Sequence, residues 1–248
     1  MRRRGLVLGP EIVRRYRAST MTDPTAAKRA VAYAAADLVQ DGMKLGLGSG
    51  STFLFVLERL AQRMKSEKLR IAGVPTSAGT AAAAQQSGIP LLSMVEVDWL
   101  DMAIDGADEI DPDKNMIKGG GAALTREKIV AAAAREMVVI VDESKLVPVL
   151  GEKFRLPVEV LTFGWRQTER AIADTGCVPT LRRTKSDDPL LTDNGNYVLD
   201  CKFEGITDPK RLHDQLNAIP GVLDNGLFVG MAGRVLVSDA SGKVRLLP

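Results

Sequence analysis

Strand-like apolar runs alternate with helix-like segments through residues 43–145, and this alternation restricts the fold more than any other feature of the sequence. Each strand-like run ends in a glycine or polar cluster, after which apolar residues recur at helical spacing. This order predicts a parallel sheet with helices on both faces. The strand-like runs are MKLGLGSGST (43–52), LRIAGVPTS (69–77), IPLLSMVEV (89–97), LDMAIDGADE (100–109) and MVVIVDESK (137–145).

The pattern changes after Gly151. The next segments predict the order β-α-β-β-α, which is close to a ferredoxin-like unit. We therefore predict an α/β fold in which a Rossmann-like parallel sheet domain carries a smaller inserted α+β ferredoxin-like domain. The expected boundaries are 21–151 plus about 224–248 for the first domain and about 152–223 for the second. The new segments are RLPVEVL (155–161), WRQTERAIADTG (165–176), VPTLRR (178–183), NYVLDCKF (196–203) and DPKRLHDQLNAI (208–219).

The charge is unevenly distributed along the chain. Of the 33 basic residues, six are arginines within residues 1–20, which contain one acid, so the remaining chain carries 27 basic and 30 acidic side chains. A slightly acidic folded part argues against a nucleic-acid partner. No apolar run reaches the ~20 residues of a membrane helix, so we expect no membrane partner and a cytoplasmic location. We interpret residues 1–20 as a disordered extension or a misplaced start, although their arginines also suit a transit peptide.

Histidine and cysteine are scarce. His213 is the single histidine and lies in a charged helical pattern, which predicts a surface position and excludes a multi-histidine metal site. A Ser/His/Asp triad would have to use that one ring. Cys177 and Cys201 are too few for a disulfide framework, so we expect two reduced, inert thiols.

The segment GLGSGST (46–52) has the composition of an anion-binding loop but matches neither common phosphate motif. Ser51 replaces the last glycine of the dinucleotide pattern, and the lysine of the P-loop is missing. Its glycines allow backbone N–H groups to approach one phosphate, its hydroxyls add donors, and a predicted helix begins directly afterwards. A plain strand-to-helix turn remains the alternative.

The segment DGADEIDPDKNMIKGGGAALTREK (105–128) divides into parts of different character. Asp105 and Asp108 end an apolar strand, at the sheet edge where open α/β folds bind ligands, and a magnesium site there is an alternative. The run 111–115 has turn chemistry, so Asp111 and Asp113 are expected to be solvated, and the calcium-loop template fails at Met116.

The second half of this segment combines a cation with three glycines. Three successive glycines are costly to order, so KGGG (118–121) favours close backbone approach to a ligand. Glu127 follows in the first turns of the next helix, where a carboxylate also complements the helix dipole. On spacing alone, Glu127 is an ordinary surface residue.

Taken together, GLGSGST, DGADEID, KGGGAALTREK and VDESK, in this order and spacing, resemble ribose-5-phosphate isomerase of the A type. The resemblance runs from about Lys28 through LPVEV, TDNGN and AIPGV to GLF, which is nearly the whole chain beyond the leader. Ser49 stands where many members of the family have threonine, and it keeps the hydroxyl. The arginine-rich leader lies outside the family pattern.

The resemblance implies an aldose–ketose isomerase that interconverts D-ribose 5-phosphate and D-ribulose 5-phosphate in the pentose phosphate pathway, without metal or organic cofactor. It implies Glu127 as the proton-transfer base, and we assign charge stabilisation to Lys118 and hydroxyl-proton shuttling with ring opening to Asp105. The substrate contacts it implies are Lys28, Ser49, Gly50, Ser51, Thr52, Asp105, Gly106, Ala107, Asp108, Lys118, Gly119, Gly120, Gly121 and Lys145.

Two other classes of function remain as alternatives. A non-catalytic sugar-phosphate-sensing domain would use the same phosphate loop, but it leaves Glu127 and Lys118 without a task. A deaminase or lactonase on a related sheet would be expected to depend on histidine. The expected partners are a small phosphosugar and further copies of the chain, in a homodimer or a homotetramer.

Overall fold

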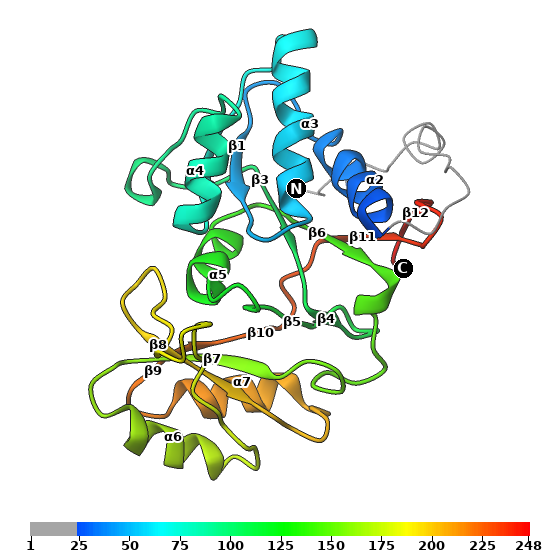
Figure 1. The fold of residues 1–248 in the computed structure, drawn as a ribbon. Coiled ribbons are helices and arrows are strands. Elements are labelled where there is room, and N and C mark those ends of the chain that lie inside the picture. Colours follow the sequence, from blue (N-terminus) through cyan, green and yellow to red (C-terminus); the bar gives the residue numbers. More distant parts are fainter. Residues whose placement is uncertain (1–23) are drawn as a thin grey trace.

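The computed structural model describes residues 24–248, and the expected extension at residues 1–20 lies outside this range. The chain forms an α/β protein with a mainly parallel central sheet, below which a smaller group of strands and helices is attached (Figure 1). The predicted alternation of strands and helices is therefore confirmed for the first half of the chain.

The central sheet has six strands in the order β12-β11-β6-β3-β1-β2. All neighbours pair in parallel except β12, which runs antiparallel to β11 at one edge. The parallel strands bring the ends of segments far apart in sequence to one edge. The bounds are β1 (Lys44–Leu47), β2 (Ala72–Pro75), β3 (Met102–Gly106), β6 (Met137–Asp142), β11 (Arg234–Ser238) and β12 (Val244–Leu246).

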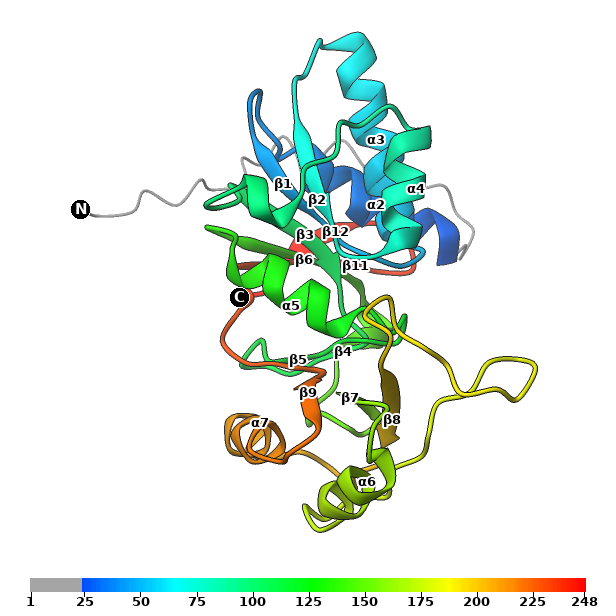
Figure 2. The same ribbon diagram turned by 90° about the vertical axis from the view of Figure 1, so that its left-hand side faces the viewer.

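Helices cover both faces of this sheet (Figure 2). On one face, Leu45, Ile104 and Ile140 pack with the buried sides of α2 and α3, and on the other face Ala103 packs with Val130 of α5. Successive strand residues point to opposite faces, so strands buried on both sides are apolar throughout. The helices are α2 (Pro24–Ala36), α3 (Phe53–Ser66), α4 (Ala78–Gln86) and α5 (Leu124–Ala132).

The apolar run 89–97 is not a strand of the sheet. It makes one isolated bridge, between Gly73 and Leu91, and then a 3₁₀ turn at Met94–Glu96 that Ser93 and Glu96 close with a capping box. The side-chain to backbone hydrogen bonds of the capping box favour the turn over continued strand pairing.

A small sheet, β10-β5-β4, lies between the two larger parts of the molecule (Figure 1). Its strands are too short to show the alternation of apolar and polar residues by which a strand is recognised in a sequence. They are β4 (Glu109–Ile110), β5 (Met116–Ile117) and β10 (Leu227–Phe228). The predicted turn at 111–115 joins β4 to β5. Asp111, however, is buried rather than solvated, because its carboxylate accepts the backbone N–H and side-chain amide of Asn115.

The second part contains an antiparallel sheet in the order β8-β7-β9, packed against two helices. The segment 178–183, expected as a strand, makes only isolated bridges, such as Val178 with Lys202 and Leu181 with Leu199. His213 is half-buried here and contacts Asn225 and Asn217. The bounds are β7 (Leu156–Val160), α6 (Trp165–Ala173), β8 (Tyr197–Cys201), α7 (Pro209–Asn217) and β9 (Val222–Asn225).

Candidate functional site

A cavity of about 160 Å³ lies at the carboxyl ends of the parallel strands β1, β3 and β6. Every site residue expected from the sequence lines this cavity. Residues 140–142, at the end of β6, line it as well and are not among the expected site residues. The expected residues along its wall are Lys28, 49–52, 105–108, 118–121, Glu127 and Lys145.

Lys118 is the buried cation at the centre of the site, with its side chain 3% exposed. Its ammonium Nζ lies 2.9 Å from Asp105 Oδ2 and 3.2 Å from Glu127 Oε2, and it donates a hydrogen bond of 2.6 Å to the carbonyl of Gly106. Apart from the ion pair with Lys118, Glu127 Oε2 has no hydrogen-bond partner among the described residues. Glu127 Oε2 is thus a buried carboxylate oxygen whose close partner is the Lys118 ammonium.

Asp105 connects the two halves of the cavity. Its Oδ1 accepts hydrogen bonds from the backbone N–H groups of Ser49, at 3.0 Å, and Gly106, at 2.8 Å, while Oδ2 faces Lys118. A side chain at Gly48 would place its Cβ 2.3 Å from Asp105 Oδ1, so only glycine allows this contact. Gly48 therefore lets the GLGSGST segment pack against Asp105, in addition to any part it has in letting backbone N–H groups approach an anion.

The glycine loop before α5 is fixed from two sides. Asp108 Oδ2 accepts the N–H of Gly120 at 2.8 Å, and a Cβ on Gly120 would lie 2.8 Å from the other oxygen of that carboxylate. Arg182, from the second part of the chain, donates to the carbonyls of Gly119 and Gly120 at 2.9 and 3.1 Å. These contacts turn a segment of high conformational freedom into a defined wall of the cavity.

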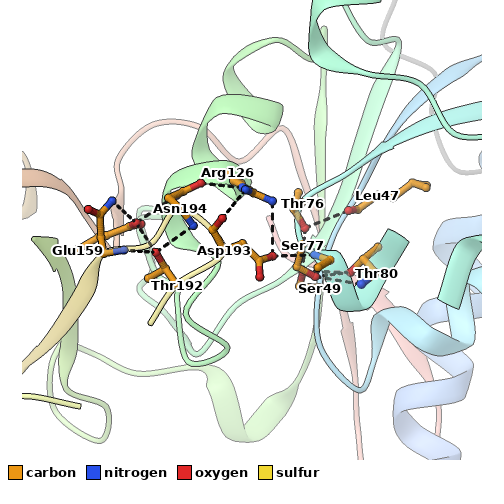
Figure 3. A network of polar contacts seen from close by, with 12 residues as sticks. Leu47, Ser49, Thr76, Ser77, Thr80, Arg126, Glu159, Thr192, Asp193 and Asn194 are labelled. Atoms are coloured by element: carbon orange, nitrogen blue, oxygen red, sulfur yellow. Dashed lines mark hydrogen bonds and ion pairs between the residues drawn. The ribbon is translucent and has the colours of Figure 1, made fainter. Parts of the chain in front are cut away.

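The loop at 49–52 forms a hydroxyl-rich cup at the start of α3. Ser49 Oγ contacts the hydroxyls of Thr76, Ser77 and Thr80 at 2.8, 2.9 and 3.1 Å (Figure 3). Lys28 Nζ donates to Ser51 Oγ at 3.3 Å. A helix N-terminus, hydroxyl donors and a lysine ammonium together suit a phosphate group.

Burial and neighbouring charges change the pKa values of the central pair. Burial and, after it, the charge of Asp105 raise the pKa of Glu127, Lys118 opposes both, and the net result is a rise from 4.5 to about 7. Burial by itself lowers the pKa of Lys118, but the carboxylates of Asp105 and Glu127 outweigh it and raise this pKa above its ordinary range. The site therefore combines a carboxylate that can exchange a proton near neutral pH with a permanent cation.

Other chemistries find little support in the described residues. Between residues 24 and 248, no three His, Cys, Asp or Glu side chains are grouped so that they could bind a metal ion. His213 lies outside the cavity lining, and Cys177 and Cys201 are free thiols buried in the second part. In this same range, no helix has the length and apolar character needed to cross a bilayer.

Comparison with known proteins agrees with this geometry. Residues 72–242 match the family described as ribose 5-phosphate isomerase A (phosphoriboisomerase A). The chain belongs to this family. Its relatives include ribose-5-phosphate isomerase A 1 of Oceanobacillus iheyensis, 50% identical over 88% of this chain and 97% of the relative. The isomerase A of Thermosynechococcus vestitus is 52% identical over 86% and 91% of the two chains.

Solved structures from the family share the whole fold. Ribose 5-phosphate isomerase A of Methanocaldococcus jannaschii superposes with a TM-score of 0.86 at 42% identity, covering 91% of this chain and 99% of that one. A D-ribose-5-phosphate isomerase in complex with phospho-erythronic acid gives 0.86 at 40% identity, covering 89% and 97%. The family resemblance inferred from the sequence motifs is thereby confirmed.

The raised pKa of Glu127 predicts a pH-dependent stability. An acid whose pKa is higher in the folded than in the unfolded chain binds more protons when folded, so folding becomes less favourable as the pH rises from 4.5 to about 7. This effect amounts to about 3 kcal/mol for a change of this size. Glu127→Gln lacks it, so the variant should gain stability relative to the wild type between about pH 5 and pH 8. Urea unfolding of both proteins across this range measures the gain, and parallel curves would contradict it.

Proposed function

We propose that this chain interconverts D-ribose 5-phosphate and D-ribulose 5-phosphate, as an aldose–ketose isomerase of the pentose phosphate pathway. The observation that carries the proposal is the buried pair of Glu127 and Lys118, 3.2 Å apart, beside a hydroxyl-rich cup. An enediolate mechanism requires a base whose pKa lies near the working pH, and a cation close to the oxygen atoms of the two carbons between which the proton moves.

The proposed roles follow the movement of protons. Glu127 removes the proton from C2 of the open-chain aldose and returns it to C1, while a hydroxyl proton passes from O2 to O1. The cis-enediolate formed between these steps carries negative charge on oxygen, which the Lys118 ammonium stabilises. Asp105, next to Lys118, transfers the hydroxyl protons and assists opening of the furanose ring. Each proton removed is thus restored at a neighbouring atom.

The proposed phosphate site is the cup formed by residues 49–52. Lys28 and Lys145 supply positive charge at the cavity wall. Thr52, the N-cap of α3, makes no side-chain hydrogen bond to the first turn of the helix, so the positive end of the helix dipole faces the cup without a side-chain cap. The solved isomerase in complex with phospho-erythronic acid supports a ligand that carries a phosphate and a planar carboxylate, whose negative charge lies on oxygen. Such an acid resembles the enediolate in charge and planarity.

The proposed reaction can be tested directly with purified protein. Mixing it with D-ribose 5-phosphate should produce ketose at a rate unchanged by EDTA, because every proposed role belongs to a side chain. D-Ribose without the phosphate should react much more slowly, because the cup is then empty. Absence of ketose with folded protein would favour the alternative, a non-catalytic sugar-phosphate-sensing domain.

We also propose a two-domain organisation, with about 152–223 forming a ferredoxin-like unit inserted into a Rossmann-like domain of 21–151 and about 224–248. The antiparallel order β8-β7-β9 with α6 and α7, extended by the bridges of segment 178–183, supports the ferredoxin-like assignment. Pairing of β9 with β7 supports a return to the first domain just after Asn225.

We further propose a homodimer or homotetramer that works in the cytoplasm. Large apolar side chains exposed on the described surface, such as Phe163 at 93% and Val95 at 92%, support self-association. Light scattering coupled to size-exclusion chromatography distinguishes a monomer, which would contradict the proposal, from the two assemblies.

A further inference from the structure

The second part of the chain contacts the helix that carries Glu127 at the two residues directly before it. Thr125 Oγ1 donates a hydrogen bond of 2.5 Å to Glu159 Oε2 on β7. Arg126 Nε donates to Asn194 Oδ1 at 2.8 Å, and its Nη2 donates to the carbonyl of Asp193 at 2.7 Å. Figure 3 shows the contacts of Arg126 as part of one chain of polar groups that runs from Glu159 through Asn194 and Asp193 toward Ser77. The proposed functions of the cavity residues do not account for this network.

Glu159 is the buried centre of the network. Glu159 is 0% exposed, and four neutral donors form hydrogen bonds to its carboxyl group. Besides Thr125, which donates to Oε2, the donors to Oε1 are Thr192 Oγ1 at 2.7 Å, Asn194 Nδ2 at 3.1 Å and Asn196 Nδ2 at 3.0 Å. A buried polar group with this many partners is costly to disturb and fixes the geometry of the groups around it.

The turn at 192–196 extends the network to the other wall of the site. Asp193 Oδ2 accepts the backbone N–H of Ala78 at 2.7 Å, at the start of α4, and lies 3.5 Å from Arg126 Nη1. Ser77, the N-cap of α4, contacts Ser49 in the proposed phosphate cup. The turn at 192–196 therefore connects α5, which carries Glu127, with Ser77 and Ala78, which lie behind the proposed phosphate cup.

The sequence of α5 does not fix its own first turn. Its N-cap is Ala123, which makes no side-chain cap, and Ala122 before it has a φ of 61°, a conformation that favours glycine. An uncapped helix start over a glycine-rich loop has few local restraints. The contacts to Thr125 and Arg126 supply those restraints from the second part of the chain.

We propose that Glu159, with Asp193 and Asn194 of the following turn, are positioning residues that set the place of the Glu127 carboxylate against Lys118 and Asp105. The proposal rests on Glu127 being the proton-transfer base. Misplacement of a reacting group by about 1 Å can cost about 10²-fold in rate. A loosened first turn of α5 also admits water to Glu127, which removes part of the burial that keeps its pKa high.

A matched pair of substitutions at Thr125 tests the proposal. Thr125→Val keeps the shape but removes the donor to Glu159, whereas Thr125→Ser keeps the hydroxyl. We expect Thr125→Val to lower kcat about tenfold or more, while KM changes by less than about twofold. The acid limb of its pH–rate profile should move to lower pH, because burial is the largest cause of the raised pKa of Glu127 and water admitted to the site removes part of that burial. The charged groups that face Glu127 are Asp105 and Asp108, which raise its pKa, and Lys118, which lowers it. Serine should restore most of both properties.

A second measurement keeps the proposal separate from the assigned reaction. Carboxyl ¹³C NMR titration gives the pKa of Glu127, whose signal is identified by its absence in Glu127→Gln. We expect a lower pKa in Thr125→Val than in the wild type. An unchanged pKa overturns the positioning role, whatever the activity, and absence of isomerase activity in the wild type overturns the assigned reaction alone.

If Thr125→Val fails to fold, Asn194→Ala takes its place, because Asn194 is exposed and its loss removes the contact to Arg126. Asp214→Ala is the control, since it breaks an exposed ion pair with Lys210 on α7 of the same part of the chain. The control should retain the kcat and the acid limb of the wild type. Equal changes in Asn194→Ala and Asp214→Ala would mean that the network has only a general structural role, and would overturn the proposal.

Discussion

Glu127→Gln should lower kcat by about 10²–10⁴-fold while KM for D-ribose 5-phosphate changes by less than about threefold. Glutamine has nearly the same volume and can still contact Lys118, but it cannot accept a proton from C2. Because the substrate-binding groups of the cup and the glycine loop are untouched, the loss should fall on the chemical step. Steady-state kinetics with both sugars measures the two constants.

Two further variants sharpen this experiment. Glu127→Asp keeps a carboxylate but shortens its reach by one methylene, so its kcat should lie between those of the wild type and Glu127→Gln. Glu152→Gln, which removes an exposed acid outside the cavity, should be indistinguishable from the wild type. Near-normal turnover in Glu127→Gln would remove Glu127 from the mechanism.

Much of the fold follows from local periodicity, and the exceptions have identifiable causes. The parallel strands within residues 43–145 were predictable because each is buried on both faces and forms an apolar run that ends in a polar cluster. Strands β4, β5 and β10 have two residues each, too few to show a period. The run 89–97 is apolar enough for a strand, but the capping box formed by Ser93 and Glu96 makes a turn there.

The candidate site divides in a similar way. The cup and the acids at 105 and 108 were predictable because polar clusters at strand ends meet at one edge of a parallel sheet. The glycine loop was predictable because three successive glycines are costly to order. Glu127 could be identified only through the family resemblance, since in the first turn of a helix its local pattern is that of an exposed acid. Its burial depends on Lys118 and on the packing of α5 against the sheet and β7, contacts that join residues far apart in sequence. Glu159, inside an apolar strand, gives no local signal of its link to α5.

Lys118→Met should produce the second large loss, about 10²–10³-fold in kcat, which is typical for removal of one group that stabilises a developing oxyanion. The substitution has an additional effect on Glu127. Since Lys118 lowers the pKa of Glu127, its removal should raise that pKa above about 7. The acid limb of the pH–rate profile should therefore move to higher pH, opposite to the direction expected for Thr125→Val.

Lys128→Met provides a matched control for the loss of a buried ammonium. Both lysines lie over the ring of Phe228, with Nζ at 5.3 Å for Lys118 and 5.0 Å for Lys128, but Lys128 pairs with Asp224 and does not line the cavity. Both variants should lose stability, because each leaves a carboxylate without its cation. Only Lys118→Met should move the acid limb to higher pH, because loss of the Lys128 contacts to Asp224 and Asn225 can only loosen α5 and lower the pKa of Glu127. An equal upward shift in both variants, or no upward shift in Lys118→Met, would contradict the assignment of Lys118 to the reacting oxygen atoms.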